Sequence, residues 1–149
     1  MAPLVAMSCI KSEDDTAITP ASAPTSGTCK LTDAEEVGPF PLYEKRDASI
    51  THADITEGKT GTPLRVALTI RNVNNNCAVV ANATVVIWHC DKDGYYSGYV
   101  NQGYLGTQDN KAKTFCRGLA PTDADGVARF QTIYPGWYSG RATHIHAQI

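Results

Sequence analysis

Alternation of apolar with other side chains in residues 64–71 limits the fold of this chain more than any other feature. One face of this segment would carry Leu64, Val66, Leu68 and Ile70. Because successive side chains of a strand point to opposite faces, the pattern predicts a half-buried β-strand. Such a strand buries its apolar face against a second layer of structure.

Further short strands are expected along the chain. They are predicted at residues 84–89, 126–133 and 144–149. The first of these is nearly all apolar and is therefore expected to be central, whereas the polar, glycine-punctuated segment 97–113 is expected to be a long loop. Short strands at this spacing predict an all-β fold, specifically an antiparallel β-sandwich. The length of 149 residues indicates a single domain.

The N-terminal 28 residues differ in composition from the rest of the chain. Cys9 follows a short apolar stretch that ends in small residues, which resembles the end of a bacterial lipoprotein signal with Cys9 as the lipid-anchored residue. An incidental cysteine in a disordered terminus is the alternative. Residues 10–28 are rich in Ser, Thr, Ala, Pro and Asp, which predicts a flexible tether. We therefore expect a signal remnant and tether over 1–28, a folded domain over 29–149, and an exported protein, either a cell-envelope lipoprotein or secreted.

Cysteine content indicates the cellular compartment of the protein, and net charge limits the classes of partner that it can bind. Five cysteines in a small domain indicate an oxidising compartment. We expect at least one disulfide among Cys29, Cys77, Cys90 and Cys116, which allow three pairings that the sequence does not resolve. The formal net charge of -2 shows no basic excess, so nucleic acid is not an expected partner.

The last sixteen residues carry the strongest chemical signal. His144 and His146 are two residues apart, so on a strand both imidazoles would lie on one face, and imidazole is the commonest side-chain metal ligand. Tyr138 follows a Pro-Gly turn just upstream. No Asp or Glu follows Gly126, so the oxygen ligands of a metal here would be phenolates, which favour a ferric ion. A strand pair without a metal is the alternative.

Several motifs in a fixed order carry a family resemblance. They lie at residues 88–99, 115–118, 122–126 and 134–146, with upstream matches at 29–40 and 54–64. Together they resemble the intradiol ring-cleavage dioxygenases, and in particular the secreted branch related to the catechol and protocatechuate enzymes. The resemblance runs from about Cys29 to the end of the chain.

The resemblance implies an Fe(III) centre and its ligands. The implied ligands are Tyr96, Tyr138, His144 and His146. Tyr95 and Tyr99 compete locally with Tyr96, and their alternative role is packing at the rim. Arg141 would stabilise negative charge that develops on the substrate ring, and Trp137 would line the pocket. His89 belongs to a motif but is expected to be a hydrogen-bonded structural residue.

The implied activity is oxidative cleavage of a catechol-type substrate by O2 to a cis,cis-muconate, in aromatic compound catabolism. Two alternatives belong to other classes: a catalytically inactive cell-surface β-sandwich binding module, and a zinc site at the histidines, which the rarity of tyrosine as a zinc ligand disfavours. A homo-oligomer is one option for the assembly. The chain ends three residues after His146, where family members normally continue, so we expect a domain that lacks its C-terminal part.

Overall fold

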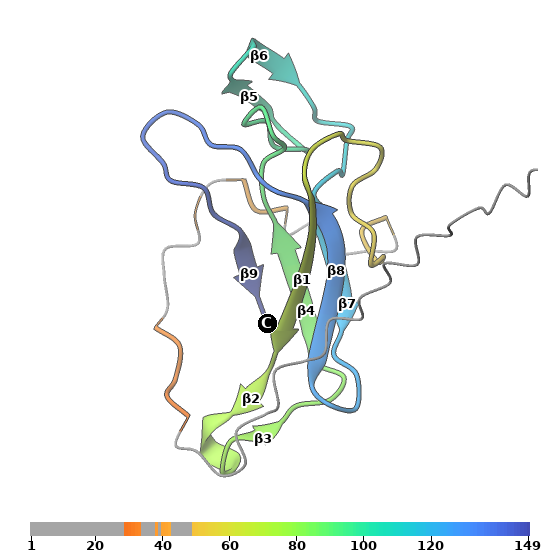
Figure 1. Ribbon diagram of the computed structural model, residues 1–149, viewed down its shortest axis with the longest axis vertical. Helices are drawn as coiled ribbons and strands as arrows, with labels where there is room; N and C mark the ends of the chain where they lie inside the picture. The colour runs from red at the N-terminus through yellow and green to blue at the C-terminus, as the bar shows by residue number, and fades with distance from the viewer. Residues whose placement is uncertain (1–28, 34–37, 39, 43–48) are drawn as a thin grey trace, which may run out of the picture.

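The computed structural model describes residues 29–33, 38, 40–42 and 49–149 (Figure 1). The regular structure within these ranges is almost entirely strand. The elements are β1 (Pro63–Thr69), β2 (Arg71–Asn72), the 3-10 turn η2 (Val73–Asn75), β3 (Ala78–Val79), β4 (Thr84–Trp88), β5 (Val100–Gly103), β6 (Gly106–Asp109), β7 (Arg117–Pro121), β8 (Val127–Ile133) and β9 (His146–Gln148). The tether expected over residues 1–28 lies outside the described residues.

Two antiparallel sheets form the layers of a sandwich. One sheet pairs β1 with β8 along their full length, and the other has the order β7-β4-β9 (Figure 1). An apolar cluster joins the two sheets, with buried members Ile55, Val85, Ile87, Ala128 and Phe130. The antiparallel β-sandwich predicted from the strand pattern is therefore confirmed.

The alternation that predicted the first strand is present in β1. Its side chains alternate between exposed and half-buried along the whole strand, and the half-buried ones at 66 and 68 pack against the cluster between the sheets. The strand ends at Thr69, and the chain then enters the short β2–β3 ribbon.

Strand β4 is buried on both faces, in agreement with its predicted central position. Val85 and Ile87 point into the cluster between the sheets. Val86 and Trp88, on the opposite face, belong to a second cluster that also contains Tyr96. This second face of β4 is the floor on which the candidate site is built.

Two sequence predictions are corrected by the fold. The segment 97–113, expected to be a loop, contains the β5–β6 hairpin, whose register runs from the pair Val100 and Asp109 to the pair Gly103 and Gly106. The last strand begins at His146, so His144 lies outside it. Strand β7 was not predicted, because its sequence Arg-Gly-Leu-Ala-Pro has no period-two pattern.

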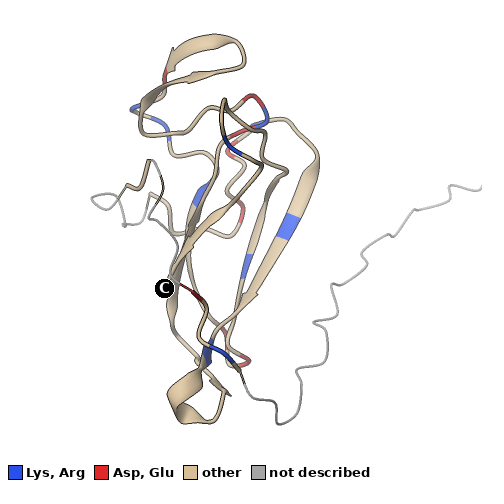
Figure 2. Cartoon of the chain, turned by 90° about the vertical axis from the view of Figure 1, so that its left-hand side faces the viewer, with Lys and Arg blue, Asp and Glu red and all other residues tan. Residues whose placement is uncertain are grey.

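The charged residues are interspersed rather than sorted by sign. Figure 2 shows Lys, Arg, Asp and Glu along the described chain, many of them in loops. Among the described residues, no helix is long and apolar enough to cross a membrane.

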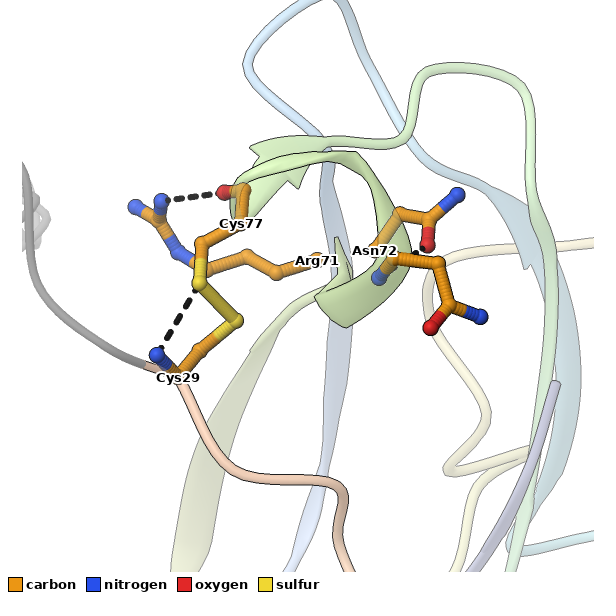
Figure 3. Close-up of a disulfide and its surroundings, with 5 residues drawn as sticks. Cys29, Arg71, Asn72 and Cys77 are labelled. Carbon is orange, nitrogen blue, oxygen red and sulfur yellow. Dashed lines mark hydrogen bonds between the residues drawn. A yellow bond between two sulfur atoms is a disulfide. The ribbon is translucent and has the colours of Figure 1, made fainter.

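One disulfide joins the N-terminal segment to the β2–β3 ribbon. It links Cys29 to Cys77, which are 48 residues apart in the sequence, and the backbone amide of Cys29 lies 2.9 Å from the Cys77 sulfur (Figure 3). Arg71 donates to the Cys77 carbonyl at 3.0 Å. Cys90 and Cys116 are buried free thiols. The predicted disulfide among these four cysteines is thus present, with its pairing identified.

We expect the Cys29–Cys77 bridge to stabilise the domain substantially. Closing a loop of this length removes roughly 4 kcal/mol of chain entropy from the unfolded state. The double variant Cys29→Ser/Cys77→Ser should therefore show a lower free energy of unfolding in urea. Alkylation of the native oxidised protein should label neither Cys90 nor Cys116 until denaturant is added. Equal urea midpoints for variant and wild type would contradict this prediction.

Candidate metal centre

The structure brings the four predicted ligand side chains together over the outer face of β4. The hydroxyl oxygen of Tyr96 lies 3.3 Å from Nε2 of His144. The rings of Tyr96 and Tyr138 are 5.8 Å apart between centroids, as are those of Tyr138 and His144, and those of His144 and His146 are 4.8 Å apart. Two phenols and two imidazoles from three segments of the chain therefore share one small volume.

His146 is placed by the pairing of β9 with β4. It lies opposite Trp88 in the register, and its ring stacks on the Trp88 ring with centroids 4.8 Å apart. Gly38 also lies against this ring, because a Cβ added there would come within 2.2 Å of the imidazole. The ring is thus in contact with an indole and with a backbone segment that only glycine allows to approach so closely.

His144 is placed by a backbone hydrogen bond rather than by a strand. Its Nδ1 lies 2.6 Å from the carbonyl oxygen of Ala142. Because a carbonyl only accepts, Nδ1 carries the proton and Nε2 holds a free lone pair in the neutral ring. Metal-ligating histidines are commonly oriented by a partner of this kind on the other ring nitrogen. The nitrogen with the lone pair is the one that faces Tyr96.

Tyr96 is the most firmly held of the four side chains. It is fully buried, and Phe40 stacks on its ring at 4.6 Å. Its backbone amide donates to the Asn101 side chain at 3.2 Å. The next residue, Ser97, is also fully buried and donates through Oγ to the carbonyl oxygen of Phe115.

Asp91 ties together the two segments that carry the tyrosines. Its side chain, almost wholly buried, accepts from the amides of Asp93 and Tyr95 and pairs with Lys59 at 2.6 Å. Its carbonyl oxygen accepts from the amide of Gly136 at 3.0 Å. The turn before Tyr96 and the loop before Tyr138 are therefore fixed to the same residue.

Two glycines allow these segments to touch. A Cβ on Gly136 would lie 2.3 Å from the carbonyl oxygen of Lys92, and a Cβ on Gly94 would lie 2.8 Å from that of Trp137. Contacts this short exclude any side chain at either position. Gly136 is therefore required for backbone packing, whereas the turn predicted at Pro135-Gly136 is absent and the nearest turn lies at residues 139–140.

The donor atoms suit a metal ion. The hydroxyl of Tyr138 and Nε2 of His146 are buried, and within the described residues neither has a hydrogen-bond partner. Buried polar atoms are rarely left unpaired, because each costs free energy. Among the described residues there is no cluster of three or more His, Cys, Asp or Glu, so the phenols are needed to complete a ligand set. Two neutral imidazoles and two phenols fit a ferric ion.

Burial also sets the charge state of the centre. Burial, and after it the electrostatic influence of the nearby His144 and Arg117, lowers the pKa of His146 to about 4, so its ring is neutral and able to bind a metal at neutral pH. Burial, reinforced by Cys90 and Tyr138, raises the pKa of Tyr96 above its ordinary value. Without a cation nearby, the Tyr96 phenol therefore stays protonated.

The competing aromatic and histidine residues have other roles. Tyr95 is buried in a separate cluster, and its hydroxyl donates to Gly106 and accepts from the amide of Leu105, which holds the β5–β6 hairpin. Tyr99 donates to the carbonyl of Pro41. His89 is fully buried, with Nδ1 against the Cys90 carbonyl at 2.7 Å and Nε2 against the Thr132 hydroxyl at 2.8 Å. His89 is thus the hydrogen-bonded structural histidine that was expected.

A cleft of about 710 Å³ opens beside Tyr138. It is lined by Lys92, Asp93, Gln102, Gly103, Tyr104, Trp137, Tyr138 and Ser139. Trp137 is 64% exposed and is one of the residues that line this cleft. Arg141, three residues after Tyr138 in the sequence, is exposed to solvent. Its backbone amide donates to the Tyr138 carbonyl at 3.1 Å.

Sequence reasoning missed the supports of the centre. Asp91, Arg117 and Phe40 each contact a ligand or the segment that carries it, yet none is a ligand type for this site. All three residues lie within the motifs at 29–40, 88–99 and 115–118, but the motifs alone gave them no structural role. The contacts of Arg117 and Phe40 depend on packing between segments far apart in the sequence.

The metal-free protein should lose stability as pH falls from about 6.5 to about 4. In that window the unfolded state protonates His146 while the folded state does not, since the folded pKa is about 4. The loss is on the order of 3 kcal/mol for this residue. Urea unfolding between pH 7 and pH 4.5 measures it, and His146→Gln should flatten the dependence. A wild-type slope in that variant would place the titrating group elsewhere.

Comparison with known proteins identifies the family. A family model described as Dioxygenase matches residues 39–148. The beta chain of protocatechuate 3,4-dioxygenase from Burkholderia cepacia is 32% identical over 120 residues, which are 73% of this chain and 50% of that protein. The chain thus spans about half the length of this curated relative.

Solved structures agree with this match. An intradiol ring-cleavage dioxygenase from Tetranychus urticae superimposes with a TM-score of 0.68 and 31% identity, over 80% of this chain and 58% of that one. The dioxygenase domain of a dioxygenase carbohydrate-binding fusion from a Streptomyces species gives a TM-score of 0.57 and 26% identity, over 78% and 63%. With the sandwich and its cluster of two tyrosines and two histidines, these matches show that the chain belongs to the intradiol ring-cleavage dioxygenase family.

Proposed function

We propose that this protein binds Fe(III) through Tyr96, Tyr138, His144 and His146 and cleaves catechols with O2 between the two hydroxyl-bearing carbons, giving cis,cis-muconates. The observation that carries the proposal is the convergence of two phenols and two imidazoles, with the Tyr138 hydroxyl and His146 Nε2 buried and without a hydrogen-bond partner among the described residues. When bound, the ferric ion supplies chelation of the catechol oxygens and withdraws electron density from the ring. Two phenolates also offset much of the ferric charge, which lowers the cost of burying it.

The two tyrosines are assigned different tasks. Tyr96 is fully buried beneath Phe40 and stays in place. Tyr138 is half-buried, lies in a segment without regular structure and borders the cleft. Its hydroxyl oxygen is therefore the one that can move and accept a proton from a catechol hydroxyl. General-base catalysis of this kind contributes roughly two to four orders of magnitude in rate.

The cleft beside Tyr138 supports a neutral catechol as the substrate. Its cation, Lys92, pairs with Asp93 at 2.8 Å, so its charge is largely offset within the cleft itself. Trp137 offers an apolar wall for an aromatic ring. Arg141 is assigned to stabilise negative charge on the ring as the substrate ionises. These features favour catechol or a broad range of catechols over a substrate with a ring carboxylate.

Export from the cytosol is part of the same proposal. The Cys29–Cys77 disulfide supports it, because structural disulfides persist in oxidising compartments. The lipid anchor proposed at Cys9 lies outside the described residues. Treating intact cells with protease, and assaying detergent extracts for an acylated N-terminal peptide, would test location and anchor.

Protein expressed from its full reading frame with ample iron should contain one iron per chain and should be reddish. The physical reason is charge transfer from phenolate to ferric ion, which absorbs visible light. Elemental analysis and the visible spectrum measure both, and oxygen uptake with catechol measures turnover. Zinc, or no metal, in a colourless protein would instead support an inactive β-sandwich binding module.

Replacing each tyrosine should separate their tasks. Tyr138→Phe should keep some iron and some colour but bind catechol slowly and turn over poorly, because the base is lost. Tyr96→Phe should lose most of the charge-transfer band even with substrate present. Spectra of both variants, with and without catechol and alongside iron content, check this. Equal iron in both, with wild-type binding rates in Tyr138→Phe, would overturn the assignment.

A further inference from the structure

A buried cation lies beneath the Tyr96 segment. Arg117, the first residue of β7, is only 2% exposed, and no ion pair among the described residues includes it. Burying a charge without an opposite charge costs several kcal/mol. Such a residue needs either strong hydrogen bonds or a nearby anion. No carboxylate among the described residues pairs with Arg117, so hydrogen bonds to other groups must stabilise it.

The guanidinium instead holds the residue that follows Tyr96. Its Nε donates to Ser97 Oγ at 2.9 Å, and its terminal nitrogen donates to the Ser97 carbonyl oxygen at 2.7 Å. Ser97 Oγ in turn donates to the Phe115 carbonyl at 2.7 Å, two residues before Arg117. The fork therefore fixes one short piece of backbone from two directions.

Strand register places Arg117 in line with the centre. Trp88 of β4 lies opposite Arg117 of β7 on one side and opposite His146 of β9 on the other. Directly paired residues point to the same face of a sheet. Arg117, Trp88 and His146 thus form a row across the floor of the centre, and Tyr96 packs in the same cluster as Trp88.

We propose that Arg117 is the positioning residue of the metal centre: its fork on Ser97 fixes Tyr96, and its charge compensates the phenolate that Tyr96 presents to the metal. The compensation of charge rests on the proposed function. The positioning of Tyr96 through Ser97 also applies to the metal-free chain. Arginine suits the task because its planar fork can engage both acceptors of Ser97 while it remains charged.

The first test uses metal-free protein. In Arg117→Met, amide hydrogen exchange in the segment 95–99 should become about tenfold faster, because local opening no longer breaks the Ser97 bonds. Val85→Ala is the matched control: it weakens the core between the sheets without touching this segment, so it corrects for a general loss of stability. Exchange no faster in Arg117→Met than in Val85→Ala would reject the positioning role, whether or not the protein binds iron.

The second test uses iron. Against a competing chelator, Arg117→Met should bind Fe(III) about tenfold or more weakly, as expected for supports of metal ligands, and its charge-transfer band should shift. Arg117→Lys, which keeps the charge, should recover part of the affinity. Arg129→Met, which removes an exposed arginine paired with Asp123, should match wild type.

The outcomes are distinct for the two proposals. Wild-type protein without iron would refute the proposed function and the compensating charge together, leaving the exchange experiment to decide the positioning role. Iron in wild type, with equal affinity in Arg117→Met, would refute only the role of Arg117. Arg117→Lys no better than Arg117→Met would refute charge compensation.

Discussion

Burial of both faces of β4 is the constraint on which the rest of the structure depends. One face, through Val85 and Ile87, closes the sandwich against β1 and β8. The other face, through Val86 and Trp88, has no second sheet among the described residues, so loops cover it. The covering side chains are Phe40, Tyr96 and Tyr138, two of which are candidate ligands. The site is therefore also the closure of a hydrophobic surface, and folding itself brings the ligands together.

Residue types and their order were enough to predict the sandwich, whereas the four candidate ligands were implied by the family resemblance. Period-two alternation identified β1 and the apolar run identified β4, while Tyr138 and the histidine pair indicated half of a candidate metal site. These signals are local: each depends on residues close together in the sequence. Even so, His144 reaches the centre from outside β9, through the Ala142 carbonyl, and not as half of a strand pair.

The features that were missed depend on contacts that leave no periodic pattern in the sequence. The β5–β6 hairpin is polar and short, and what holds it is the Tyr95 hydroxyl between Gly106 and Leu105, with the Tyr104 amide on the Asp93 carbonyl. Arg117 likewise sits in a strand that has no pattern of its own. Hydrogen bonds of this kind connect elements whose proximity becomes known only when the fold is known.

Different anchoring of the two tyrosines follows from the same geometry. Tyr96 leaves β4 through a turn that Asp91 fixes, and it ends beneath Phe40 and above a charged fork. The segment around Tyr138 is held by two backbone hydrogen bonds, one from the Gly136 amide to the Asp91 carbonyl and one from the Arg141 amide to the Tyr138 carbonyl. The cleft lies beside Tyr138. Both hydrogen bonds hold backbone, whereas the Tyr138 side chain packs against the cluster that contains Trp88 and Tyr96. Under the proposed function, the phenol of Tyr138, beside the cleft, is therefore the one placed to exchange its partner when a chelating substrate enters, while the buried Tyr96 stays in place.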